Sequence, residues 1–309
     1  MKQLVIVICL MLFSVGGLSA QKTVFDNVKI RRHRSAEKRV LVDKLGKLTF
    51  DDTARFLRYE SDADDHIEVG YDDVEKVVFD LATHMRGGAL SQVISAAPLA
   101  GPIVGGAVAG AHVNDYWFYL DYKKQGQRES TLLVVPKGAS AQVIGKATSV
   151  FGSRVTIASF PEKGEAINKN DLKAIKSKQV LKINRQDHPL PEVKPDKATV
   201  VVVCPPLAAR YAGQGNQFKL HANDEIIAVN RAGTYSFAYL APGKYRLASQ
   251  AEDANGFEME LEAGHEYFFL QNIFQGAFKG ETGLSRNSRE VVLYLADGAY
   301  LAEWQNNEQ

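Results

Sequence analysis

Alternating apolar residues between Gly233 and Ser249 constrain the fold of this chain more than any other feature. Apolar or aromatic side chains occupy every second position, which is the spacing of strands that bury one face. The Pro242-Gly243 dipeptide predicts a turn between two such strands, because proline fixes φ and glycine accepts a positive φ. The alternating positions are Tyr235, Phe237 and Tyr239 in the first run, and Tyr245 and Leu247 in the second.

Further short strand patterns surround this pair throughout residues 198–303. Their regular spacing, with Gly, Pro and Asn at the turns, favours a β-sandwich over alternating strands and helices. The run Ala198–Cys204 predicts a buried strand at the start of the domain. The other predicted strands are 217–221, 225–230, 234–239, 244–249, 257–262, 266–273 and 290–295.

Several motifs of this region are similar to a known family. They are the opening Val-rich strand, Ile226–Val229, Gly233–Tyr235, the Leu240–Tyr245 turn and Ala263–Tyr267. On these residues the segment resembles the domain-of-unknown-function family 2846. The resemblance implies a transthyretin-like or carboxypeptidase-regulatory-like sandwich found in exported envelope proteins, and it implies no established activity. The chain departs from a common pattern of that family because it has no lipid-attachment cysteine, so tethering by acylation is not expected.

The first twenty residues have the three regions of a secretory signal peptide: a charged start at Lys2, an apolar core over 4–13 and small residues over 16–20. The apolar run is too short to span a bilayer comfortably. We therefore expect export to the periplasm or the extracellular space, with an uncleaved anchor as the alternative. Cleavage would remove Cys9 and leave only Cys204, so no internal disulfide is expected.

The charges of the chain balance, with 37 Lys and Arg residues against 36 Asp and Glu residues. Such a chain has no overall field to attract nucleic acid, so a nucleic-acid partner is not expected. A local basic cluster lies within residues 22–40. It is either a contact for an anionic head group or polymer, or a solvated segment before the first strand. Its members are Lys29, Arg31, Arg32, His33, Arg34, Lys38 and Arg39.

Residues 22–160 predict a first domain of short antiparallel strands followed by one helix. Strand patterns fill 40–80, and they resume at 115–122 and 130–135 with a polar loop over 123–129 between them. The helix is predicted from Val143, Ile144, Ala147, Val150 and Phe151, which share one helical face, and Gly152 is placed to end it.

This succession resembles the pleckstrin-homology or GRAM-like fold on Gly46–Phe50, Ile67–Tyr71 and Val74–Phe79. The resemblance implies a binding or scaffold module, without ligand residues. The fold class expected for the whole chain is therefore mainly β: a PH-like barrel with a C-terminal helix, a linker over 161–197, and a β-sandwich over 198–303. Five apolar residues of the linker are expected to form a short helix or strand on the first domain. They are Leu172, Ile175, Val180, Leu181 and Ile183.

An Ala- and Gly-rich insertion, residues 87–114, carries no formal charge. Gly101 with Gly105, and Gly106 with Gly110, repeat the small-xxx-small spacing that lets helices approach closely in lipid. The hypothesis is that the segment mediates peripheral membrane contact or self-association. The alternative is an excursion of the chain that packs on the first domain.

Catalytic and metal-binding motifs are missing from the sequence. The seven histidines have no paired-ligand spacing, no Gly-x-Ser-x-Gly occurs, and Gly101–Gly106 has no Gly-Lys-Ser/Thr after it. The acidic run Ser61–His66 lacks the glycine and closing glutamate of a calcium loop, which favours a solvated turn. We therefore expect no cofactor. The histidines are His33, His66, His84, His112, His188, His221 and His265.

Together these features predict an exported, non-catalytic binding or scaffold protein of the bacterial cell envelope, with an envelope protein or glycan as its partner. One alternative is a peripheral membrane or self-associating protein that acts through residues 87–114. The other is an uncharacterised hydrolase, for which His188, His221 or His265 with a carboxylate in a cleft between the domains would be required.

Overall fold

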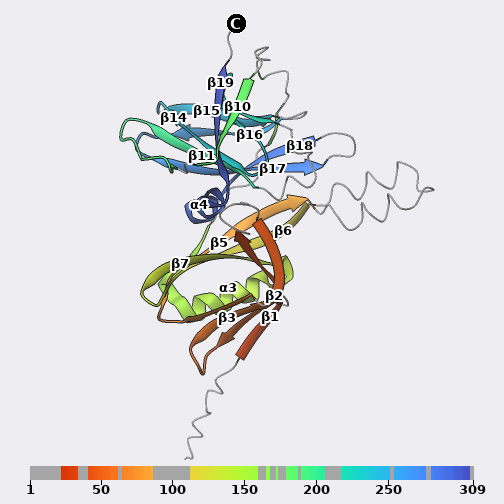
Figure 1. The fold of residues 1–309 in the computed structure, drawn as a ribbon, viewed down its shortest axis with the longest axis vertical. Helices are drawn as coiled ribbons and strands as arrows, with labels where there is room; N and C mark the ends of the chain where they lie inside the picture. Colours follow the sequence, from red (N-terminus) through yellow and green to blue (C-terminus); the bar gives the residue numbers. More distant parts are fainter. Residues whose placement is uncertain are drawn as a thin grey trace, which may run out of the picture.

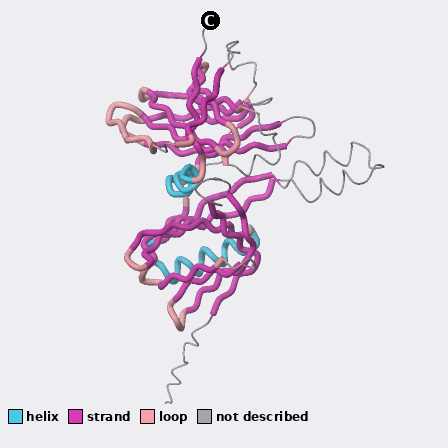
Figure 2. Tube along the Cα trace, viewed as in Figure 1, coloured by secondary structure: helices cyan, strands magenta, loops and turns pink. Residues whose placement is uncertain are grey.

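The computed structural model describes residues 22–33, 41–61, 65–85, 112–158, 165–167, 172, 179–186, 189–205, 217–250, 254–275 and 280–306. Over these residues the chain forms three β-sheets and two α-helices, so the expected mainly-β class is confirmed. Strands make up most of both ends of the molecule (Figure 2). We call the part up to residue 158 the N-terminal unit and the part from residue 165 the C-terminal unit.

The N-terminal unit is one curved, eight-stranded sheet with helix α3 packed on its inner face (Figure 1). The strand order is β4-β3-β2-β1-β7-β6-β5-β8. The sheet of the expected PH-like barrel is not closed over the described residues, because the edge strands β4 and β8 do not pair. The expected C-terminal helix, α3, covers its inner face. The strands are β1 Lys22–His33, β2 Leu41–Asp51, β3 Phe56–Ser61, β4 His66–Gly70, β5 Val74–Met85, β6 His112–Lys124, β7 Gln127–Val135 and β8 Val155–Ile157.

Helix α3, Lys137–Phe151, confirms the helix predicted from the apolar face. Val143, Ala147 and Phe151 are buried in the core of the unit, with Ile144 and Val150 partly buried beside them. Gly152 ends the helix with a φ of 57°, a conformation that glycine adopts without steric cost.

Strand β1 shows that the solvated-segment alternative is wrong for residues 22–33, while residues 34–40 of the basic cluster lie outside the described residues. Val28 and Ile30 of β1 are fully buried, and the strand pairs with both β2 and β7. The alternation was hard to recognise because a β-bulge shifts the register between Phe25 and Val28, where Asn27 has a φ of 60°. The loop predicted over 123–129 is also shorter than expected, since β6 and β7 are joined by only two residues.

The C-terminal unit is the expected β-sandwich, in which a six-stranded and a five-stranded sheet enclose an apolar core. The sheet orders are β10-β19-β14-β11-β17-β18 and β13-β12-β15-β16-β9. The strands are β9 Glu165–Ala166, β10 Gln179–Asn184, β11 Ala198–Cys204, β12 Phe218–Ala222, β13 Glu225–Asn230, β14 Thr234–Leu240, β15 Gly243–Gln250, β16 Ala254–Leu261, β17 Glu266–Gln275, β18 Gly280–Arg286 and β19 Tyr300–Asn306.

The strand predicted at 290–295 is wrong, because these residues belong to helix α4, Arg289–Asp297. Val291, Val292, Leu295 and Ala296 are all buried, and their spacing of one and four residues follows a helical period. The short apolar run hid this period, since such runs suit a buried strand equally well.

Described parts of the 161–197 linker belong to the sandwich rather than lying on the first domain. β9 pairs with β16, and β10 pairs with β19. Leu172 is buried against Ala248 and Ala254. The described apolar residues of the linker therefore belong to the C-terminal unit, and Ile175 lies outside the described residues.

Candidate functional site

Helix α4 lies between the two units and is the candidate functional site, as the element that joins them (Figure 1). One side of α4 packs on the outer face of the six-stranded sheet, and another packs on the outer face of the N-terminal sheet. The buried set, which we call the junction core, consists of Trp117, Leu132, Val134, Val201, Val203, Tyr235, Phe268, Leu270, Val291, Val292, Leu295, Ala296, Ala299 and Leu301.

Alternate residues of β7 belong to two different apolar cores. Leu132 and Val134 point outward into the junction core, whereas Leu133 and Val135 point inward against α3 and the other strands. Successive side chains of a strand face opposite sides of a sheet, so a continuous apolar run is needed where both sides are covered. The unbroken run Leu132–Val135 therefore marks a sheet with two buried faces.

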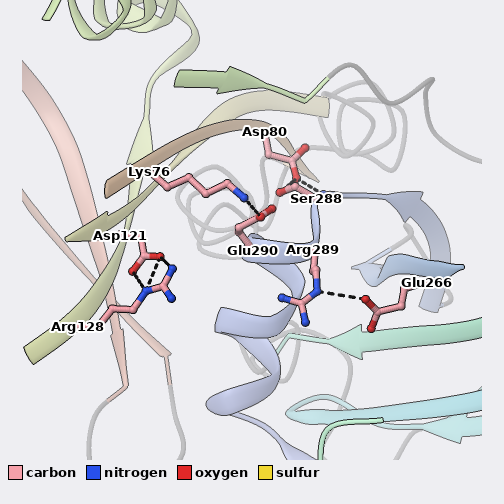
Figure 3. Close-up of polar contacts among 8 residues, drawn as sticks. All are labelled: Lys76, Asp80, Asp121, Arg128, Glu266, Ser288, Arg289 and Glu290. Carbon is pink, nitrogen blue, oxygen red and sulfur yellow. Dashed lines mark hydrogen bonds and ion pairs between the residues drawn. The ribbon is translucent and has the colours of Figure 1, made fainter. Parts of the chain in front are cut away.

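The first turn of α4 is held by a carboxylate from the other unit. Asp80 of β5 is 2% exposed, and its Oδ2 accepts hydrogen bonds from the backbone N–H of Ser288 at 2.6 Å and from the Ser288 hydroxyl at 2.7 Å. Figure 3 shows the two side chains directed toward each other. Asp80 thus neutralises a helix N-terminus whose N–H groups lack partners within the helix.

Further polar contacts surround this buried pair. Lys76 of β5 forms an ion pair with Glu290 of α4 (Figure 3). On the other side of the helix, Arg289 Nε lies 3.2 Å from Glu266 Oε2 of β17. The Tyr294 hydroxyl donates a hydrogen bond of 2.8 Å to the backbone carbonyl of Arg31 in β1. The start of α4 is therefore bonded to both units, which favours one relative arrangement of the two.

A pair of charges near the junction stays within the N-terminal unit. Asp121 of β6 and Arg128 of β7 form a bidentate ion pair across the β6–β7 hairpin (Figure 3). Hydrogen bonding to Asp121 raises the pKa of the Arg128 guanidinium. This ion pair stabilises the start of β7, and Leu132 and Val134 near the end of the same strand belong to the junction core.

A cavity of about 140 Å³ combines residues of β4, β6, β7 and α4. The Tyr122 hydroxyl donates a hydrogen bond of 3.1 Å to Glu129 Oε2 within its lining. The cavity offers phenol, hydroxyl, carboxylate and ammonium groups to a small polar molecule. It is lined by His66, Ile67, Tyr122, Lys124, Glu129, Ser130, Thr131 and Tyr294.

The structure describes only some of the residues that the sequence analysis singled out. Gly101, Gly105, Gly106 and Gly110, like the signal segment, lie outside the described residues. No helix within the described ranges is long and apolar enough to cross a membrane.

Arg31 and Asp65, one member of each charged cluster, have structural partners. Arg31 of the basic cluster is 8% exposed and stacks over the ring of Trp117 at 5.4 Å. Asp65 of the acidic run pairs with Lys44 at 2.7 Å. Its carbonyl accepts a hydrogen bond from the Ser61 backbone N–H, and its own N–H donates one to the Ser61 hydroxyl. No described group of three or more His, Cys, Asp or Glu side chains is placed to hold a metal ion.

The histidines proposed for a hydrolase are not brought together where they are described. His221 is buried in β12, and its Nε2 lies 2.9 Å from Gln250 Oε1. His265 lies in an exposed turn, where its Nδ1 contacts the carbonyl of Ala263 at 3.1 Å. His188 lies outside the described ranges.

Cys204, the one cysteine expected in the mature chain, is fully buried as its strand predicts, and burial raises the pKa of its thiol.

His221 makes the stability of the fold depend on pH. Burial is the largest cause that holds its pKa below the usual value of about 6.5. The unfolded chain then binds a proton that the folded chain does not, so stability is complete above pH 6.5 and falls as the pH drops toward the folded pKa. We expect the wild type to lose up to about 1.4 kcal/mol per pH unit more than His221→Gln in this range. Urea denaturation at pH 7.5, 6.5, 5.5 and 5.0 measures the difference, and parallel curves for the two proteins would contradict it.

Sequence reasoning missed the junction. The usable signal was Ser288, a favoured residue at helix starts, which shortly precedes the helical spacing of Val291, Val292 and Leu295.

Comparisons with known proteins identify no family: no protein-family model matches the chain, and no curated protein matches it. The resemblances to family 2846 and to the PH or GRAM-like fold therefore stay predictions.

Proposed function

We propose that this protein is an exported, non-catalytic binding or scaffold protein of the bacterial cell envelope, with an envelope protein or glycan as its partner. The observation that supports this most is the junction core, because burying one helix between two β-units couples them into one body. A scaffold gains from such coupling, since the partner contacts on each unit keep a fixed spacing and little entropy is lost on binding.

The arrangement of the remaining groups also favours binding over chemistry. Buried ionisable groups near α4, such as Asp80, are engaged in holding the helix. The cavity beside Tyr294 is small and polar, which suits a contact point for part of a larger partner. Peripheral membrane contact or self-association through residues 87–114 remains the second candidate, based on the sequence spacing of its glycines.

Capture from envelope extracts of the source organism tests the proposal. The full mature chain is immobilised and compared with Leu132→Ala, which loosens the junction, and with Leu133→Ala, which affects only the interior of the N-terminal unit. The expected result is one protein or glycan enriched by the wild type and by Leu133→Ala, and weakened with Leu132→Ala. Repeated captures from membrane, sacculus and periplasmic fractions that enrich nothing over an unrelated β-sandwich would overturn the proposal.

A further inference from the structure

A proline-rich strip, residues 189–195, leads into the first strand of the sandwich sheet, β11. Pro189, Pro191 and Pro195 have fixed φ angles. Leu190 and Lys194 each precede a proline, which disfavours helical backbone and favours extended or polyproline conformations. Five of these seven residues are thus restricted by covalent geometry alone. Binding to such a segment costs little additional ordering.

Two tyrosines of β14 hold the strip against the outer face of the sheet. The Tyr235 hydroxyl donates a hydrogen bond of 3.0 Å to the carbonyl of Pro189. The Lys194 ammonium lies 3.9 Å from the centre of the Tyr239 ring. Tyr235 and Tyr239 are four residues apart in one strand and so share a face. The strip therefore runs along β14 and is anchored near both of its ends.

Leu190 and Val193 remain exposed on this anchored strip, at 51% and 50%. They are three residues apart, and a polyproline helix has three residues per turn, so a polyproline conformation of the strip would present them on the same side. Exposed apolar side chains usually occur singly on a surface. Here two of them occur within four residues, on a segment that two tyrosines of β14 contact.

We propose that residues 189–195 form a docking strip for a partner protein with a groove lined by aromatic side chains. Extended proline-rich segments are recognised in this way, because flat rings pack on the proline rings and on the apolar residues between them. A lipid surface fits poorly, since Glu192 is charged and exposed between the two apolar side chains. A second copy also fits poorly, because Tyr235 and Tyr239 of each copy already hold its own strip.

This inference deepens the proposed binding role by naming the chemistry of the partner. Its failure can be separated from failure of that role. If capture by the full chain succeeds while the strip makes no contact, only the docking strip is wrong.

Site-specific photocrosslinking tests the strip. The full chain is produced in its source organism with a benzoyl-phenylalanine at position 190, at 193, or at the control position 157, where Ile157 is similarly exposed on the N-terminal unit. Positions 190 and 193 are expected to give the same protein adduct, about tenfold stronger than at 157 and mapped by mass spectrometry to aromatic residues of the partner. An unchanged melting temperature confirms that the probes leave the fold intact.

Two further experiments test whether the adduct depends on the strip: competition by a peptide and a substitution within the strip. An excess of the synthetic peptide 188–196 is expected to lower the adduct at position 190, and so is Val193→Asp in the same chain, since a groove of aromatic rings does not accept an unpaired carboxylate. Ile157→Asp should leave the adduct unchanged. The inference is overturned if 190 and 193 give no more adduct than 157, if the adduct is lipid or a second copy of the chain, or if neither competitor lowers it.

Discussion

Replacing Leu132 by alanine is expected to lower the free energy of unfolding by about 2 to 5 kcal/mol, the range for a fully buried leucine. Leu132 is 0% exposed and belongs to the junction core between β7 and α4. The cavity left by the substitution lies directly beside the helix, so the amide hydrogens of α4 are expected to exchange faster as well. Urea denaturation measures the first effect, and hydrogen exchange with mass spectrometry measures the second.

Leu133→Ala is the matched control for this prediction. Leu133 is the next residue of the same strand, is 1% exposed, and packs inside the N-terminal unit. A similar loss of stability is expected, whereas amide exchange in α4 should stay close to that of the wild type under native conditions. Equal acceleration of α4 exchange in both variants would mean that the junction is not a separate core.

Asp80→Ala is expected to destabilise the folded protein by about 1 to 3 kcal/mol, the cost of leaving buried donors without an acceptor. Two donors of Ser288 lose their partner, and the first turn of α4 loses the negative charge that its N-terminus favours. The effect should be largest on the connection between the units, because Asp80 belongs to one and Ser288 to the other. Denaturation monitored through Trp117, which lies at the junction, measures it.

A double-mutant cycle with Ser288→Ala isolates this contact. Ser288→Ala removes the hydroxyl donor and keeps the backbone N–H, so it should cost less than Asp80→Ala. The double variant should cost less than the sum of the two single variants, because both remove the same hydrogen bond. Strict additivity would show that Asp80 acts on stability without the Ser288 hydroxyl.

The strands of the sandwich were predictable from sequence because local patterns specify them. Glu225–Asn230 was predicted with its observed bounds, and the runs around Tyr235 and Leu247 were correct to within one residue at each end. Each has a clear alternation and a Gly, Pro or Asn turn beside it. Helix α3 was predictable for the same reason, since its apolar face continues over two full turns.

The junction was not predictable because it is formed by contacts between residues that are far apart in the sequence. Asp80 appears in sequence as one more acidic residue of a strand, and its partner Ser288 is 208 residues away. The apolar residues of α4 fit a strand as well as a helix until the outer face of β7 is known to be covered. The bulge at Asn27 hid β1 in a similar way, because one extra residue interrupts the alternation that identifies a strand.

The pairing of β10 with β19 has a consequence for how the protein is made. The ribosome synthesises β10, Gln179–Asn184, roughly 120 residues before β19, Tyr300–Asn306, which is the strand that pairs with it along its full length. α4 also emerges late, just ahead of β19. During synthesis and any export step, the edge of β10 and the outward residues Leu132 and Val134 of β7 therefore stay uncovered, and chaperones that bind exposed strands have a defined interval in which to act.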